Sequence, residues 1–178
     1  MDARTATNLV DALGAMVRAV AAARPGLGVI VDGFTTPSGA DSFWNHEFIA
    51  AEREVLPALA AQMGSVEHVA LIGRPTTEAF VWTAIADYYV RPYGSAHHKI
   101  AWLNPVPGLV HAGENKRAVS ATDAGFYARQ QGALPHFHFS EVTRTDAKRD
   151  LRTDLLSYDL DVAAFTAAVL DDLAARVP

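Results

Sequence analysis

Apolar residues recur at helical spacing in three parts of the chain. Residues 5–24 place Leu9, Leu13, Met16, Val17 and Val20 on one side, and Pro25-Gly26 follows. Residues 46–63 repeat the pattern around a proline at position 57, which predicts a kinked or split helix. A final helix begins after Asp159 or Asp161 and buries Val162, Phe165, Val169 and Leu173.

Short runs rich in β-branched residues predict strands between these helices. Residues 27–31 are a short apolar run between Gly26 and Asp32-Gly33, which is typical of a buried strand, and residues 66–73 are expected to be a second strand. The order strand, helix, strand predicts a parallel pair with a right-handed crossover. Residues 98–103 and 135–142 alternate and are also expected to be strands, and a hairpin is expected within 110–120. Residues 78–90 fit either a strand or a buried helix, and we favour the helix.

The predicted elements define an α/β or α+β fold. We expect residues 1–178 to form one domain, with a mixed sheet of four to five strands packed against three to five helices. A length of 178 residues suits one buried core, and 50% apolar against 20% charged residues is a globular composition. No targeting or membrane-spanning pattern is found, so we expect a cytoplasmic protein.

Composition narrows the chemistry. The chain has no cysteine, which excludes disulfides, thiolate metal sites and a cysteine nucleophile. A net charge of −5 argues against nucleic acid as a partner. No Gly-x-Gly-x-x-Gly, phosphate-binding loop or Gly-x-Ser-x-Gly motif is present. The sequence resembles no family closely enough to name one.

Histidines provide one candidate site. His136 and His138 are two residues apart on a predicted strand, so both rings project from the same face. With His98 they would form a set able to bind one divalent metal ion, and Glu141 or Asp32 would act as acid and base. The competing interpretation is a strand with a polar outer face.

A loop provides the second candidate site. Residues 35–45 are rich in turn-forming residues and lead into the second helix. Asp41, Phe43, Trp44 and His46 would form a binding surface there, or the aromatic rings would pack the helix onto the core. Asp32 and Arg74 follow the first two strands, so we expect them to lie close together at one end of the sheet. Tyr88, Tyr89, Arg91 and Tyr93 form an aromatic and basic group that would suit a flat ligand or would border the core.

Two functional hypotheses follow. The first is a small non-catalytic protein, of the inhibitor or immunity type, which needs no cofactor and binds a protein partner with a basic surface. The second is a metal-dependent hydrolase or lyase built on the histidines. Oligomeric state and the identity of any partner do not follow from the sequence.

Overall fold

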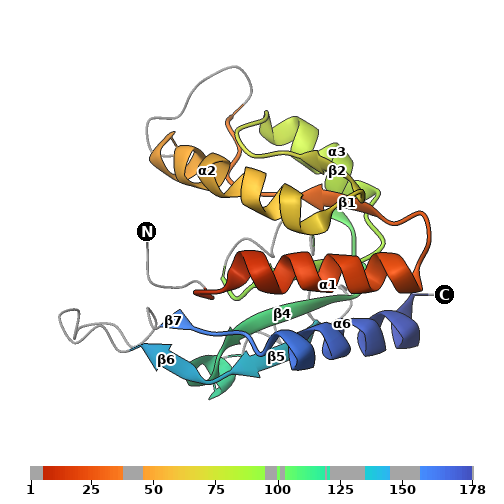
Figure 1. The fold of residues 1–178 in the computed structure, drawn as a ribbon. Helices are drawn as coiled ribbons and strands as arrows, with labels where there is room; N and C mark the ends of the chain where they lie inside the picture. Colours follow the sequence, from red (N-terminus) through yellow and green to blue (C-terminus); the bar gives the residue numbers. More distant parts are fainter. Residues whose placement is uncertain are drawn as a thin grey trace.

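Two small parallel sheets share one core with the helix α1 (Leu9–Ala23), as Figure 1 shows. The computed structural model describes residues 6–37, 46–94, 100, 103–118, 120, 135–144 and 157–177. The predicted mixture of helices and strands is confirmed. The apolar face of α1 packs against side chains of both sheets, because Leu13, Val17 and Val20 follow one another at helical spacing.

The first sheet is the expected strand–helix–strand unit. β1 (Gly28–Val31) pairs in parallel with β2 (Glu67–Ala70), with Gly28 opposite Glu67 and Val31 opposite Ala70. The connecting helix α2 (His46–Met63) is assigned as one helix that contains Pro57, so the proline does not split it.

The second sheet has three parallel strands. β4 (Gly108–Gly113) lies between β3 (Tyr89–Pro92) and β5 (His136–Ser140), and all six residues of β4 are buried. The single sheet of four to five strands that we expected is therefore wrong: the parallel strands form a pair and a triplet. The apolar side chains of β1 and β3 meet in the core around α1, and no strand pairing between β1 and β3 is found within the described ranges.

Three local expectations also change. The helix α3 (Thr76–Ala84) ends early, since Asn104 Nδ2 donates to the carbonyls of Thr83 and Ala86, and β3 follows. Ile100 and Leu103 are helical, so the strand expected at 98–103 is wrong. The hairpin expected within 110–120 is replaced by the end of β4 and the 3-10 helix η2 (Glu114–Lys116), because β4 pairs with parallel neighbours on both sides.

The C-terminal helix covers the second sheet. The antiparallel pair β6 (Val142–Arg144) and β7 (Ser157–Tyr158) leads into α6 (Val162–Arg176). Asp161 caps this helix as predicted, because its carboxylate accepts a hydrogen bond of 3.0 Å from Ala164 N. Phe165 and Val169 of α6 are fully buried. Among the helices that the structure describes, none is long and apolar enough to cross a membrane.

Candidate binding site at the carboxyl edge of the sheets

Both carboxylates that we proposed for catalysis lie where a parallel strand ends. Asp32 follows β1 directly, and Glu141 follows β5. Asp32 forms an ion pair with Arg91 of β3, and the two side chains are only 15% and 12% exposed. We expected Arg74 beside Asp32, but Arg74 is 57% exposed and pairs at 3.8 Å with Glu78. The ion pair joins the end of one sheet to a strand of the other, where ligands commonly bind in α/β folds.

The start of the β1–α2 loop is fixed by hydrogen bonds to the segment after β2. Gly73 N donates to Phe34 O at 2.7 Å, Thr36 N donates to Arg74 O at 3.0 Å, and Thr76 N donates to Thr36 O at 2.8 Å. The hydroxyls of Thr35 and Thr76 lie 3.0 Å apart. Because backbone and side-chain groups both take part, these residues form a preorganised base for the rest of the loop.

Two glycines let α2 approach this base closely. A Cβ on Gly33 would lie 2.3 Å from Glu52 Oε2, and that same oxygen accepts a hydrogen bond of 2.7 Å from Phe34 N. A Cβ on Gly73 would lie 2.3 Å from the guanidinium of Arg53, and Gly73 has a φ of +70°. The positive φ of Gly73 favours glycine there, whereas a side chain at position 33 would displace the end of the Glu52 side chain.

Two phenylalanine rings stack at the surface beside the loop. Phe34 and Phe48 have ring centroids 4.8 Å apart, and the residues are 41% and 45% exposed. We call this pair the aromatic platform. The aromatic platform was not predicted from the sequence, because Phe34 and Phe48 are separated by a loop and only the tertiary structure brings them together. The presence of Phe34 directly after Asp32-Gly33 was the one available signal.

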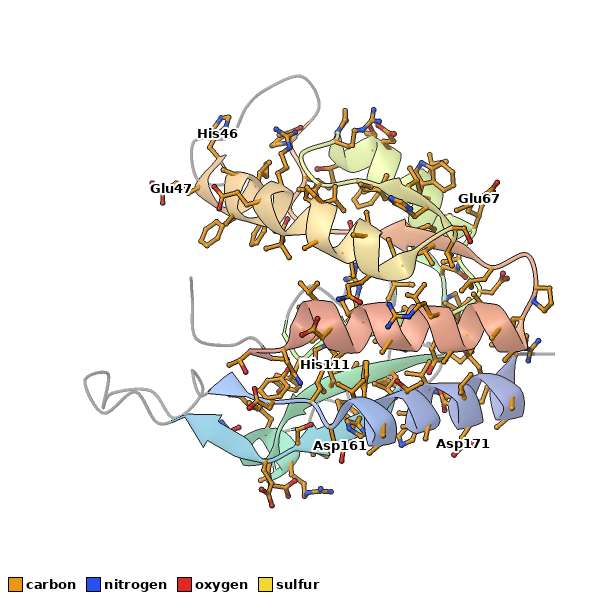
Figure 2. All side chains as sticks on the ribbon, in the orientation of Figure 1. His46, Glu47, Glu67, His111, Asp161 and Asp171 are labelled. Carbon is orange, nitrogen blue, oxygen red and sulfur yellow. The ribbon has the colours of Figure 1, made fainter. Side chains whose placement is uncertain are left out.

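The structure describes some of the predicted binding residues and not others. His46 is the first residue of α2 and lies at its exposed end beside Glu47, as Figure 2 shows. Arg74 contributes its carbonyl to the base of the loop. Asp41, Phe43 and Trp44 lie outside the described residues, and so does His98. The loop that carries most of the predicted surface thus begins and ends at the carboxyl edge.

Three histidines lie on the face of the second sheet that α6 covers: His111, His136 and His138. His138 of β5 lies opposite His111 of β4 in the strand register, and both rings contact Phe165 with centroid distances of 5.7 and 5.6 Å. His136 Nδ1 lies 3.6 Å from Asp172 of α6. Sequence reasoning missed His111, because it stands in a wholly apolar strand rather than an alternating one.

Burial controls the charge of these rings. His111 is 1% exposed, its Nδ1 lies 2.8 Å from Tyr158 Oη, and burial lowers its pKa to about 3. Burial and the neighbouring His136 lower the pKa of His138, and Asp161 opposes that shift. The His111 ring lies against Phe165 of α6 and Tyr158 of β7, and Figure 2 labels it below α1. A neutral buried ring of this kind has a structural role rather than an acid–base role at pH 7.

The same face carries a polar network near the start of the strands. Tyr88 Oη donates to Asp172 Oδ2 at 2.7 Å, and Arg176 Nε lies 2.9 Å from Asp172 Oδ1. Burial and the Asp172 carboxylate raise the pKa of Tyr88, and burial raises the pKa of Tyr89 to about 12. Both phenols are therefore neutral at pH 7, and the network holds α6 against the second sheet.

A metal centre lacks support in the described part of the chain. Within those ranges, no three histidine or carboxylate side chains come together as a set able to hold a metal ion. His136 and His138 share a face as predicted, but the third predicted ligand, His98, lies outside the described residues.

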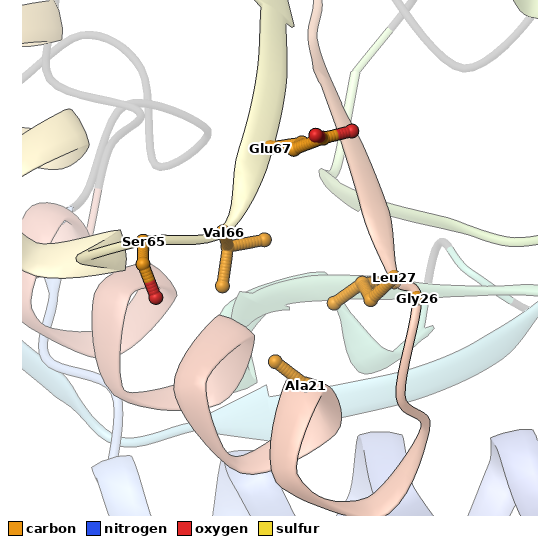
Figure 3. A pocket seen from close by; sticks show the side chains of 6 residues that line it. All are labelled: Ala21, Gly26, Leu27, Ser65, Val66 and Glu67. Carbon is orange, nitrogen blue, oxygen red and sulfur yellow. The ribbon is translucent and has the colours of Figure 1, made fainter.

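A pocket of about 270 Å³ lies at the opposite end of the first sheet, where β1 and β2 begin (Figure 3). Its lining offers one hydroxyl and one carboxylate and is otherwise apolar; it consists of Ala21, Gly26, Leu27, Ser65, Val66 and Glu67. These groups form no catalytic arrangement, so the carboxyl edge remains the better candidate site.

Comparisons with known proteins do not add a family. No protein-family model matches the chain, and neither a curated protein nor a solved structure does.

Proposed function

We propose that this chain acts by binding a protein partner with a basic surface, through the aromatic platform and the β1–α2 loop beside it. The observation that supports this most is the stacked, half-exposed pair Phe34–Phe48. Exposed aromatic rings are unfavourable in water, and aromatic side chains supply much of the binding energy of protein interfaces.

Preorganisation of the loop base supports the same proposal. Phe34 is held through its N–H by Glu52 and through its carbonyl by Gly73. A surface that is ordered before binding loses less conformational entropy on association, so more of the contact energy appears as affinity.

Charge favours a basic partner. The net charge of the chain is −5, and α2, which carries Phe48, also carries the exposed carboxylates Glu47 and Glu54. Opposite charges accelerate the encounter of two proteins, and salt screens this effect.

Site-specific photo-crosslinking tests the proposal. Benzoylphenylalanine at position 34 replaces one aromatic ring by another, and we expect it to form a discrete covalent adduct in an extract of the native host. The adduct should weaken in the Phe48→Ser background and at about 0.5 M salt, where the Debye length falls to roughly 4 Å.

Position 81 is the matched control, because Val81 is an exposed apolar residue on α3 (65% exposed). The same probe there should not form the adduct. Absence of any discrete adduct from position 34, or the same adducts from both positions, would contradict the proposal.

The metal-dependent hydrolase or lyase remains the alternative, with His98, His136 and His138 as ligands and Asp32 or Glu141 as acid and base. Metal analysis of the untagged protein separates the two hypotheses. The protein-binding hypothesis predicts well under one equivalent of bound zinc, iron or manganese per chain. One equivalent that is lost in a His136→Ala, His138→Ala variant would favour the enzyme.

A further inference from the structure

Cationic side chains and aromatic rings gather at the carboxyl ends of β3, β4 and β5, on the face of the sheet away from α1. Val90 packs into the core around α1, whereas Tyr89 and Tyr93 pack into the second core, with Val110. Since side chains alternate along a strand, Arg91 lies on the same side as Tyr93. Lys116 and Arg117 lie in and just after η2, the short helix that follows β4.

The cations and the rings are in contact. Lys116 Nζ lies 5.8 Å from the centroid of the Tyr93 ring, and Arg117 Cζ lies 4.4 Å from that of Phe139. Arg117 also donates to Glu114 at 2.8 Å. We call Arg91, Tyr93, Lys116, Arg117 and Phe139 the cation–ring cluster. Guanidinium and ammonium groups bind phosphate, and aromatic faces bind flat rings, so one ligand could use both.

The strand order puts this cluster where α/β folds bind ligands. The chain passes from β1 to β2 in one sheet, and from β3 to β4 and β5 in the other. The Asp32–Arg91 pair connects the end of β1 to β3, so the two sheets adjoin there. Ligands bind preferentially outside the carboxyl ends of parallel strands.

We propose that the cation–ring cluster binds a nucleoside phosphate. Its phosphate would attract Lys116 and Arg117, which withdraws them from the Tyr93 and Phe139 rings and opens those ring faces to the base. Glu141 follows β5 at the same edge and is exposed, so it offers a carboxylate acceptor for ribose hydroxyls. This site is separate from the aromatic platform, and the proposal does not depend on protein binding there.

The cluster suits a single nucleotide rather than a polynucleotide. Its cations are confined to the ends of two adjacent strands, and the whole chain carries a net charge of −5. Extended nucleic acids need many phosphate contacts along a basic surface, which this composition does not provide.

Calorimetric titration of the full chain with AMP and UMP tests the proposal, with adenosine and pyrophosphate as partial ligands. We expect saturable binding of at least one nucleotide with a Kd of about 1 mM or tighter. The Lys116→Ala variant should weaken it about tenfold, because one charge-assisted contact is lost. The Tyr93→Leu variant should weaken nucleotide binding while leaving pyrophosphate binding unchanged.

Arg74→Ala is the matched control, since it removes an exposed cation of the first sheet. Its nucleotide affinity should equal that of the wild type, and circular dichroism confirms that each variant is folded. The proposal is overturned by absence of saturation with either nucleotide at about 10 mM, by equal losses in Lys116→Ala and Arg74→Ala, or by a pyrophosphate affinity equal to that of the nucleotides.

Discussion

Burial of single side chains sets the charges on which this protein depends. His111 is enclosed by β4, Phe165 and Tyr158, and its pKa of about 3 keeps it neutral. Asp32 and Arg91 are also mostly buried, but each has a charged partner. Burial favours the neutral form of an isolated titratable group such as His111, whereas the mutual attraction of an ion pair offsets part of the cost of burying two charges.

Acid should destabilise the fold through His111. The folded pKa of about 3 lies below the unfolded value near 6.5, so the unfolded state takes up the proton first as the pH falls. Stability from this group is complete above about pH 6.5 and falls as the pH approaches 3, by up to about 1.4 kcal/mol per pH unit.

Urea unfolding between pH 7 and pH 4.5 measures this dependence. The His111→Asn variant keeps a polar group near Nδ1 but cannot titrate, so we expect a shallower fall than in the wild type. Carboxylates contribute equally to both proteins, and the difference between them isolates the histidine. Identical slopes would contradict the assigned pKa.

At the scale of elements, the segments that follow β1 and β2 are adapted to α2. Gly33 and Gly73 in these segments have no side chains, and Glu52 and Arg53 of α2 occupy the space. This contact aligns the start of α2 with the base of the loop, and thereby positions Phe48 against Phe34. The aromatic platform is thus a consequence of how α2 packs.

Substitution of these glycines should reveal that packing. Gly73→Ala adds a Cβ within 2.9 Å of Ile49 Cγ2, at a φ of +70°. Gly64→Ala is a matched control, because Gly64 has a φ of +69° and nothing within 4 Å of the added atom. Backbone strain should lower the free energy of unfolding of each variant by about 1 kcal/mol. Overpacking should lower that of Gly73→Ala by at least ~1 kcal/mol more. Equal losses in urea unfolding would argue against a tight α2 contact.

At the scale of the whole molecule, α1 unites the two sheets. Its buried side chains share one core with β1, β4 and α6, although the sheets lack a common strand ladder in the described chain. The Asp32–Arg91 pair adds a second connection at the carboxyl edge. Both candidate ligand surfaces lie at this edge, one on each side of that pair.

One cooperative unfolding transition follows from this arrangement. Far-ultraviolet circular dichroism and tryptophan fluorescence should give coincident urea curves, since neither sheet keeps its core without α1. Two separate transitions would show that the sheets fold independently and would contradict the single-domain expectation.

The Arg91→Ala variant leaves Asp32 without its guanidinium partner. Its free energy of unfolding, measured by the same urea titration, should fall by about 3 kcal/mol.

The local elements followed from the sequence wherever the pattern was local. α1, α2, β1, β2 and the Asp161 cap of α6 depend on apolar spacing and on capping groups, which neighbouring residues decide. The parallel pairing of β1 with β2 followed from the helix between them. The absence of cysteine and the net charge of −5 are likewise fixed by the chain itself.

Only the tertiary structure decided the division into two sheets, the partner of Asp32, the burial of His111 and the aromatic platform. These features join residues that are 14 to 59 positions apart, as in Phe34 with Phe48 and Asp32 with Arg91. Pairings over such separations arise because helices and strands pack as units, so local spacing carries no record of them.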